Sequence, residues 1–191
     1  MKVVRSNYIR IAYVIGTLDV GGTEHQLVAL VKGLDCSAFS PIIFCLTATG
    51  PLATDLEKAG AEVRCFGLRG LNVWRNPIRV ARCLLAFLAA LKAETPDIIH
   101  GFLFHAYTLG TFAAKIAGVP MVIASRRSLS HFKAGKPHYV LAERLANRMT
   151  DLIVTNSKAV QQDVIHQEKV EPAKVRVVYN GIDPSLYDVP A

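Results

Sequence analysis

The sequence is poor in cysteine, and the few cysteines that it has are widely spaced. Only four occur in 191 residues, namely Cys36, Cys45, Cys65 and Cys83, and no two of them form a C-x-x-C pair. Histidine and cysteine nowhere show the spacing of a metal site. The sequence therefore predicts neither a disulfide framework nor a bound metal, and free thiols in a reducing compartment are expected.

A long uninterrupted hydrophobic run is also missing. The longest strongly apolar run, residues 83–91, is far shorter than the roughly 20 residues that a membrane-spanning helix needs. The apolar residues 11–15 are too few for the hydrophobic part of a signal peptide. We therefore expect a cytoplasmic protein.

Acidic residues are scarce, because 15 Asp and Glu stand against 22 Lys and Arg, which gives a net charge of +7. A basic protein attracts anions such as nucleic acid, phosphorylated metabolites or an anionic membrane surface. Aromatic and basic residues are not interleaved in the manner of a nucleic-acid stacking platform, so we do not expect nucleic acid as a partner. The expected partners are thus phosphorylated ligands and an anionic membrane surface.

Familiar cofactor and catalytic motifs are absent as well. The sequence has no G-x-G-x-x-G dinucleotide fingerprint, no G-x-x-x-x-G-K-[ST] phosphate loop and no G-x-S-x-G nucleophile turn. Asp19, Glu24, Asp97 and Asp151 form no obvious carboxylate pair. The residues alone therefore indicate no bound cofactor and no visible catalytic set.

What the sequence does have is a regular alternation of short apolar runs and amphipathic segments. The runs predict strands at residues 9–15, 41–46, 62–66, 98–100, 121–124, 152–155 and 175–178. The segments between them predict helices at residues 23–34, 51–59, 77–94, 107–117, 138–149 and 158–167, with Asn76 and Ser157 as N-caps of two of these helices.

The strand runs are continuously apolar, which is typical of strands that are covered on both faces. We therefore predict an α/β fold, a single Rossmann-like doubly wound parallel sheet in one domain that covers residues 1–191. Ligands of such sheets bind at the carboxyl ends of the strands, beside the switch in strand order. The segments to inspect are therefore residues 16–24, 100–105, 125–138 and 179–183.

Two glycines, Gly21 and Gly22, stand directly before the first predicted helix. Glycine allows a close approach of the backbone, and the free N–H groups of a helix start bind phosphate. The pair therefore predicts a diphosphate site. The alternative is that the glycines only make a tight turn, with Thr23 or Glu24 favoured at the positive end of the helix.

The loops after two later strands carry the other candidate residues. His100 ends a strand and is expected to be packed and hydrogen-bonded, whereas His105 is expected to face the ligand cleft. Residues 125–138 contain no acidic residue, and guanidinium groups bind phosphate well, so this loop predicts a mobile anion site rather than a solvated loop. Its basic and histidine residues are Arg126, Arg127, His131, Lys133, Lys136 and His138.

The long helix predicted at residues 77–94 has two interpretations. Arg75, Arg79 and Arg82 form a basic stripe, Trp74 precedes them, and leucines occupy more than one side of the helix. A basic amphipathic helix with an aromatic anchor is typical of a membrane surface. A helix that packs on the sheet and has a solvated basic edge fits the same residues.

Several motifs together resemble glycosyltransferase family 4. Residues 21–24, Gly-Gly-Thr-Glu, resemble the Gly-Gly-x-Glu signature that follows the first strand in that family. Residues 96–100, Pro-Asp-Ile-Ile-His, with residues 104–106, resemble a later strand and the segment after it. Residues 156–157 and 179–183, Asn-Ser and Tyr-Asn-Gly-Ile-Asp, resemble the stretch that closes the N-terminal domain. The resemblance runs from about residue 9 to residue 183, essentially the whole chain.

The resemblance implies the N-terminal, acceptor-side half of a two-domain GT-B enzyme. Such enzymes transfer a sugar from a UDP- or GDP-linked donor to a saccharide or lipid-linked acceptor with retention of configuration, without a metal or other cofactor. Many act at the inner face of the plasma membrane. In this chain Gly21 and Gly22 would contact the donor diphosphate, and Asn180 and Gly181 would lie at the domain crossing. His105, Arg126, Arg127 and His131 would line the acceptor side of the cleft.

Two departures from the family pattern bear on these expectations. Ser125, Arg126 and Arg127 stand where many members have a histidine, and the donor-binding Glu-x7-Glu is missing. We therefore expect that the C-terminal, donor-binding domain is absent from this chain and that the isolated chain is inactive. The alternatives are half of a nucleotide-sugar epimerase and a non-catalytic module that binds an anionic glycolipid or phosphate.

Overall fold

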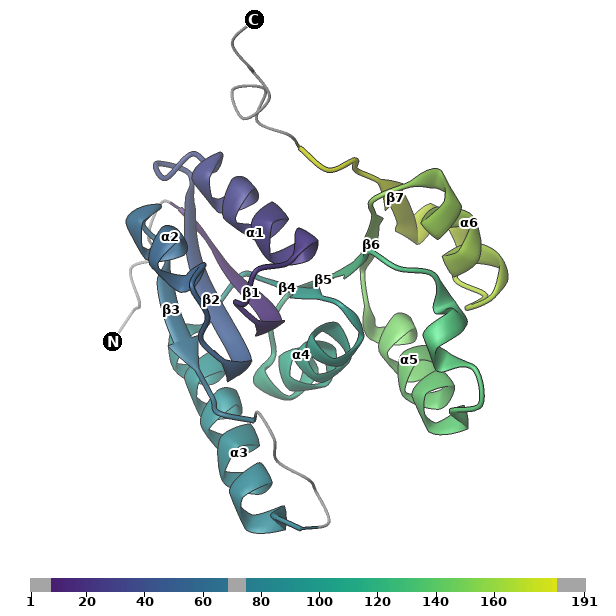
Figure 1. The fold of residues 1–191 in the computed structure, drawn as a ribbon, viewed down its shortest axis with the longest axis horizontal. Helices are drawn as coiled ribbons and strands as arrows, with labels where there is room; N and C mark the ends of the chain where they lie inside the picture. Colours follow the sequence, from purple (N-terminus) through teal and green to yellow (C-terminus); the bar gives the residue numbers. More distant parts are fainter. Residues whose placement is uncertain (1–7, 69–74, 182–191) are drawn as a thin grey trace, which may run out of the picture.

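The computed structural model describes residues 8–68 and 75–181. The described residues form one seven-stranded sheet in which every neighbouring pair of strands is parallel, in the order β3-β2-β1-β4-β5-β6-β7 (Figure 1). The strands are β1 (Ile9–Thr17), β2 (Phe39–Ala48), β3 (Glu62–Cys65), β4 (Ile98–Phe102), β5 (Met121–Arg126), β6 (Leu152–Thr155) and β7 (Val175–Val177). The predicted fold class, a single Rossmann-like doubly wound sheet, is confirmed.

Helices connect the strands. They are α1 (Gly22–Lys32), α2 (Ala53–Lys58), α3 (Pro77–Glu94), α4 (Phe104–Ala117), α5 (Pro137–Met149) and α6 (Lys158–His166), with short 3-10 turns η1 (Ser130–Lys133) and η2 (Pro172–Lys174). After β3, the connection through α3 places β4 on the other side of β1. The switch in strand order therefore lies between β1 and β4, the position at which such sheets bind ligands.

Alternate residues of the central strands build a hydrophobic core on each face of the sheet. On one face, Ile11, Tyr13 and Ile15 of β1 pack in a cluster with Leu27 and Val31 of α1. On the other face, the intervening β1 residues and Phe44 pack with Phe87 and Leu91 of α3 and with α4. This two-sided burial explains the continuously apolar strand sequences.

The structure corrects some expected boundaries and caps. Helix α4 begins at Phe104, three residues before its predicted start, and the turn η1 was not predicted. Ser157 caps α6 as expected, since its hydroxyl oxygen accepts a hydrogen bond from the Val160 N–H at 3.2 Å. Asn76 occupies the N-cap position of α3 and Pro77 begins the helix, as predicted, but the Asn76 side chain makes no capping hydrogen bond.

Two further expectations can be compared with the described residues. The four cysteines carry free thiols, as predicted. No helix in residues 8–68 and 75–181 has the length and apolar character that crossing a bilayer requires. Trp74, the aromatic residue of the possible membrane helix, lies outside the described residues.

Candidate functional site

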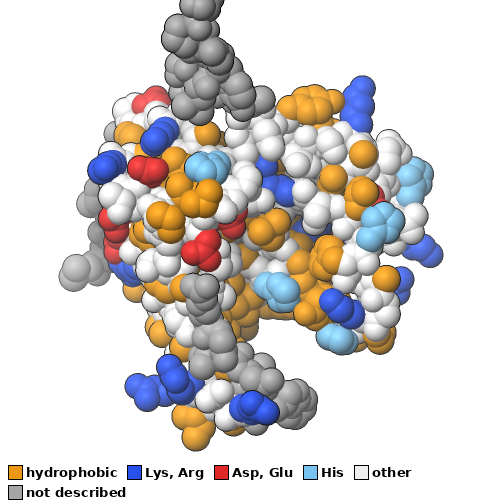
Figure 2. Space-filling model, in the orientation of Figure 1, with side chains coloured by type: hydrophobic (Ala, Val, Ile, Leu, Met, Phe, Trp, Pro, Cys, Tyr) orange, Lys and Arg blue, Asp and Glu red, His pale blue; other side chains and the backbone are white. Residues whose placement is uncertain are grey.

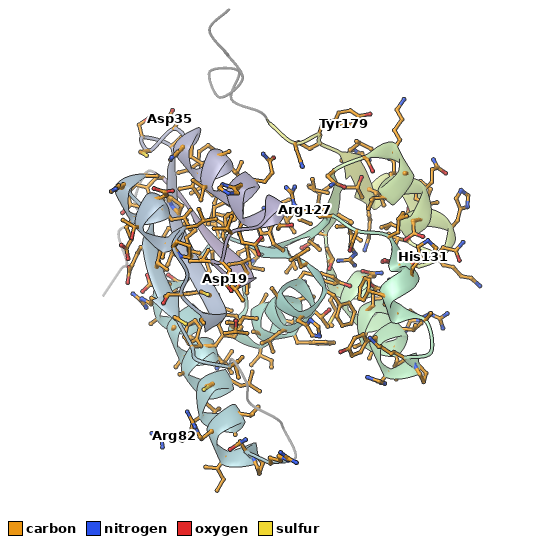
Figure 3. The ribbon with its side chains drawn as sticks, viewed as in Figure 1. Asp19, Asp35, Arg82, Arg127, His131 and Tyr179 are labelled. Atoms are coloured by element: carbon orange, nitrogen blue, oxygen red, sulfur yellow. The ribbon has the colours of Figure 1, made fainter. Side chains whose placement is uncertain are left out.

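The loops that follow β1, β4, β5 and β7 meet at the switch point, where the predicted ligand-binding segments come together. Figure 3 shows Arg127 between the start of α1 and the segment that contains Tyr179. His131 lies apart from them, on the side of α5 and α6. The sequence-predicted residues therefore divide into a group around Arg127 and a group farther along the β5–α5 connection.

The start of α1 leaves its backbone N–H groups without a side-chain cap. Gly21 is the N-cap residue, in an extended conformation, and no side chain accepts a capping hydrogen bond there. A side chain on Gly22 would meet nothing within 4 Å, so the first residue of the helix borders open space. A side chain on Gly21 would clash with the carboxylate of Glu24, which therefore lies at the positive end of the helix.

Gly50 supports this loop and was missed by the sequence analysis. A side chain at Gly50 would collide with the carbonyl group of Leu18, so the β2–α2 connection approaches the β1–α1 loop backbone to backbone. The Leu52 N–H donates to the Leu18 carbonyl oxygen at 3.2 Å. The Gly50-Pro51 pair, which begins two residues after the end of β2, was the available signal, because glycine permits such a close approach of the backbone.

Two backbone constraints fix the turn between β4 and α4. A side chain at Gly101 would clash with the backbone of Tyr107, so glycine there lets α4 pack directly on its own strand. Leu103 has φ 65° and ψ 162°, a conformation that side-chain-bearing residues rarely adopt. Strained conformations of this kind cluster at functional sites, and this one lies directly before the first turn of α4.

His100 is packed and hydrogen-bonded, as the sequence suggested. Its Nε2 and the Ser125 hydroxyl share a hydrogen bond of 2.8 Å, and its ring stacks on Phe102 with 4.5 Å between the centroids. Burial, together with the nearby Arg127 guanidinium, lowers the pKa of His100 to about 3. The imidazole is therefore neutral near pH 7 and holds β4 and β5 together.

His105 occupies the first turn of α4 and is exposed. Its Nε2 lies 3.2 Å from the Tyr139 hydroxyl of α5. Partial burial, and then the charge of Lys136, lowers the pKa of His105. The structure thus places a neutral hydrogen-bonding imidazole at the surface beside α5, and its predicted contact with the acceptor stays a prediction.

Arg126 lies inside the protein instead of facing a cleft. The residue is 5% exposed, and its guanidinium carbon lies 3.4 Å from the centroid of the Tyr107 ring. Its Nη2 donates to the Asn147 side-chain oxygen at 2.5 Å and to Glu168 at 3.4 Å. Only Nη2 has internal partners, and Nε and Nη1 are buried without a hydrogen-bond partner among the described residues. The burial of the guanidinium differs from the exposed anion-binding group expected from the sequence.

Lys133 completes a buried cluster of ion pairs with Arg126, Glu143 and Glu168. Its ammonium group pairs with Glu143 and lies 2.8 Å from Glu168. Burial and then the charge of Glu168 raise the pKa of Glu143. Burial opposes the ionised form of Glu168 as well, but Arg126 and then Lys133 hold its pKa below the usual value. Two of the basic groups in residues 125–138 are therefore neutralised by acids outside that segment.

Arg127 points to the opposite side of the sheet from this cluster and reaches the last described residues. Its Nη1 donates to the Asn180 side-chain oxygen at 2.6 Å. Burial lowers the pKa of Arg127, and the nearby carboxylate of Glu24 opposes that shift. Arg127 therefore links the start of α1 to the segment that follows β7.

Gln26 of α1 holds the same segment through two hydrogen bonds. Its side-chain nitrogen donates to the Gly181 carbonyl oxygen at 2.6 Å, and its side-chain oxygen accepts from the Gly181 N–H at 3.0 Å. Arg127, Gln26 and Gly181 line one cavity of about 440 Å³ together with His100 and Ser125. The structure thus brings Arg127, Asn180 and Gly181 together beside α1, and Gln26 is a site residue that the sequence analysis missed.

His131 is exposed on η1. It lines a second cavity, of about 520 Å³, with Lys133, Lys136, Arg144 and the acids Glu143 and Glu168. His131 and Arg127 therefore belong to different cavities.

Residues 8–68 and 75–181 contain no group of three or more His, Cys, Asp or Glu side chains that could hold a metal ion.

Comparisons with known proteins point to one family of enzymes. The family model described as Glycosyltransferase Family 4 matches residues 20–186. An Escherichia coli relative, UDP-Gal:alpha-D-GlcNAc-diphosphoundecaprenol alpha-1,3-galactosyltransferase, is 28% identical over 139 residues, which are 71% of this chain and 35% of the relative. A D-inositol 3-phosphate glycosyltransferase from Streptomyces griseus is 26% identical over 183 residues, which are 88% of this chain and 39% of the relative.

Solved structures show the same fold. The crystal structure of Anabaena Alr3699/HepE in complex with UDP and glucose matches with a TM-score of 0.76 and 22% identity, over 96% of this chain and 48% of that one. A UDP-GlcNAc 2-epimerase from Methanocaldococcus jannaschii matches with a TM-score of 0.64 and 14% identity, over 90% of this chain and 46% of that one.

The chain spans between about a third and a half of the length of these proteins. The family match, in contrast, covers most of the chain and includes the end of the β1–α1 loop, the β5–α5 segment and the residues directly after β7. The chain belongs to glycosyltransferase family 4.

Proposed function

We propose that this chain is the N-terminal, acceptor-side domain of a retaining glycosyltransferase, which moves a sugar from a nucleotide-sugar to a saccharide or lipid-linked acceptor. Family membership supports transfer of a sugar. The relatives named above include a protein whose name specifies UDP-galactose and a protein solved with UDP and glucose, which favours a UDP-linked donor over a GDP-linked one.

One observation carries the donor side of the proposal, namely the uncapped start of α1 at the switch point. The helix N-terminus attracts negative charge, and Gly21 and Gly22 leave room for a diphosphate to reach its N–H groups. The Glu24 carboxylate now beside Gly21 would turn toward Arg127 when the diphosphate binds, because Arg127 already attracts it. We propose that no metal is needed in this arrangement, since the start of α1 supplies the positive charge.

On the acceptor side we propose His105 and Arg127 as the candidate contacts. His105 is exposed at the start of α4, and the partly buried Arg127 lines the cavity of about 440 Å³. Arg126 is not proposed as an acceptor contact, because its guanidinium is enclosed by Tyr107, Asn147 and Glu168. Asn180 and Gly181 are proposed as the start of the crossing to a donor-binding domain.

The proposal places the reaction in the cytoplasm, where a lipid-linked acceptor would be reached at the inner face of the plasma membrane. The name of the Escherichia coli relative specifies a diphosphoundecaprenol-linked acceptor, which supports an acceptor of the lipid-linked class.

A nucleotide-sugar epimerase is the second candidate, because solved epimerases share this fold. The two reactions differ in their products, since an epimerase needs no acceptor. The full-length product of the gene should be incubated with UDP-glucose, UDP-galactose and UDP-N-acetylglucosamine, with and without lipid-linked and free saccharide acceptors. Mass spectrometry of the acceptor and chromatography of the nucleotide-sugar then report both reactions.

The proposal expects an acceptor that gains one sugar and an equal release of UDP, with the anomeric configuration of the donor kept in the product. Conversion of the nucleotide-sugar to its epimer without an acceptor would assign the second candidate. Binding of nucleotide-sugar without either product would favour a non-catalytic module that recognises a glycolipid or phosphate.

A further inference from the structure

Two of the four cysteines lie side by side on neighbouring strands. Cys45 of β2 and Cys65, the last residue of β3, are register partners in the parallel β2–β3 pair. Neighbouring strands lie about 4.8 Å apart, which is within the range of Cα separations that a disulfide bridges. Cys36 and Cys83 lie outside the strands. The backbone therefore places Cys45 and Cys65 within bonding range of each other.

The side chains of this pair lie on the same face of the sheet. Register partners on parallel strands point the same way, and side chains two residues apart on a strand share a face. Cys45 packs in the cluster that contains Leu27 and Val31 of α1, and Val63, two residues before Cys65, packs against that cluster. Burial, and then the charge of Cys65, raises the pKa of Cys45 to about 12, which reflects the closeness of the two thiols.

The two thiols differ in exposure. Cys45 is completely buried, and its Sγ donates to the Ala48 carbonyl oxygen at 2.9 Å and lies 3.6 Å from the Gly16 carbonyl oxygen. Cys65 is exposed and lies on β3, at the edge of the sheet. Cys65 is therefore the thiol that a reagent reaches first, and Cys45 is the neighbour that can displace the reagent from it.

Basic side chains lie beside Cys65. It lines a cavity of about 450 Å³ with Arg79 and Arg82 of α3. Both arginines are exposed, and the sequence has no acidic residue between Glu62 and Glu94. Figure 2 shows Lys or Arg side chains at the end of α3 that projects from the body of the protein. This charge attracts negatively charged reagents, so the fitting oxidants are small disulfides that carry carboxylate groups.

We propose that Cys45 and Cys65 form a redox modification site, which a small acidic disulfide converts to an internal disulfide. The Cys65 thiolate attacks one sulfur of the reagent, whose S–S bond breaks and releases one small thiolate. The Cys45 sulfur then attacks Cys65, the protein S–S bond forms, and the second small thiolate leaves. The two protein sulfurs lose two electrons and their protons, and the reagent is reduced to two thiols. The second attack is intramolecular, which offsets the low thiolate fraction of Cys45.

The disulfide acts on the connection that supports the start of α1. It removes the thiol proton through which Cys45 binds the Ala48 carbonyl oxygen at the end of β2. The connection after Ala48 contains Gly50, which approaches the backbone of Leu18 in the β1–α1 loop. Oxidation should therefore loosen this contact. An effect on donor binding rests on the proposed function, whereas the disulfide itself does not.

Peptide mass spectrometry after incubation with glutathione disulfide tests the site in the full-length product of the gene. Cys36→Ser serves as the reference protein, because trypsin otherwise leaves Cys36 and Cys45 in one peptide, residues 33–58. The reference protein should yield residues 33–58 linked to residues 65–69, and dithiothreitol should separate the two peptides.

Matched cysteine variants identify the reacting thiols. Cys65→Ser, added to the reference protein, should abolish the linked peptide. Cys83→Ser, added in the same way, should leave its yield unchanged, because Cys83 lies on α3 outside the pair. Circular dichroism should show that the Cys65→Ser protein is folded, since Cys65 is exposed.

The class of oxidant is tested in the same assay. Arg79→Gln/Arg82→Gln should slow linkage by glutathione disulfide several-fold and leave linkage by the uncharged hydroxyethyl disulfide unchanged. Arg144→Gln/Arg148→Gln removes two exposed charges from α5 and should react like the reference protein. Equal rates for Arg79→Gln/Arg82→Gln and the reference protein with glutathione disulfide would overturn the choice of an acidic reagent.

Hydrogen exchange reports the effect on the loop. Linkage should raise the exchange rate of the Leu52 amide, which donates to the Leu18 carbonyl oxygen, several-fold. An unchanged rate in the linked protein would overturn this effect. Absence of the linked peptide, or linkage of Cys65 to Cys83 instead of Cys45, would overturn the site itself. These measurements use no nucleotide-sugar, so their failure is distinguishable from failure of the proposed reaction.

Discussion

Arg127 donates a hydrogen bond from Nη1 to the side-chain oxygen of Asn180, at 2.6 Å. This contact joins the end of β5 to the residues that follow β7, and Gln26 of α1 binds the neighbouring Gly181 through two more hydrogen bonds. The segment proposed to lead toward a donor-binding domain is therefore connected to the start of α1, where the diphosphate is proposed to bind.

The first prediction concerns this connection. Gln26→Ala should increase the hydrogen-exchange rate of the Gly181 amide several-fold, because one net hydrogen bond is worth about 1 kcal/mol. Exchange measured by NMR reports that single amide. Gln161→Ala on α6 is the matched control and should leave the rate unchanged. An unchanged rate in Gln26→Ala would show that the segment is held by other contacts.

The second prediction separates the two neighbouring arginines. Arg126→Ala should lower the free energy of unfolding by about 1–3 kcal/mol, because Asn147 and Glu168 lose a buried hydrogen-bonding partner while Lys133 still pairs with Glu168. Arg148→Ala removes an exposed charge and should change stability by less than about 0.5 kcal/mol. Urea denaturation measures both values. A loss below about 1 kcal/mol for Arg126→Ala would contradict a buried structural role.

The third prediction concerns the pH dependence of stability. The pKa of His100 is about 3 in the folded protein, whereas the usual pKa of histidine is 6.5. As the pH falls from 6.5 toward 3, the unfolded chain therefore binds a proton at His100 before the folded protein does. The contribution of His100 to stability is therefore fully present above pH 6.5 and is lost as the pH falls toward 3.

His100→Gln keeps a hydrogen-bonding group toward Ser125 but cannot titrate. As the pH is lowered from 6.5 toward 3, the free energy of unfolding of His100→Gln should therefore fall less steeply than that of the wild type. Urea denaturation at several pH values compares the two slopes. Parallel curves for the two proteins would mean that His100 titrates in the same range in the folded and unfolded states.

The sequence predicted the order and type of the strands and helices well, since continuous apolar runs require coverage on both faces of a sheet. It could not predict the start of α4, because the strained φ of Leu103 and the clash of any side chain at Gly101 depend on tertiary contact with Tyr107. Local propensity carries no information on such contacts, and the predicted start of α4 was three residues late.

The same limit explains the two parts of the candidate site. Residues 125–138 looked uniformly basic, but the acids that neutralise Arg126 and Lys133 lie outside this segment. Glu168 follows Arg126 by 42 residues and Lys133 by 35 residues in the sequence. The second acid, Glu143, lies on α5. Gln26 carried no motif, and its role depends on residue 181, which lies 155 positions later. The glycines before α1 were found because their signal is local.

The most direct test of the account is donor binding at the start of α1, measured by ligand-observed NMR with UDP-glucose. The full-length product of the gene should show saturation transfer to the ligand. Gly22→Val should weaken the affinity about tenfold, because it blocks hydrogen bonds from the helix start to the diphosphate. The protein should stay folded, since a Cβ on Gly22 meets no neighbour, and Gly33→Ala at the other end of α1 is the control. Unchanged affinity in Gly22→Val, or no binding of UDP-glucose to the wild type, would contradict the proposed donor site.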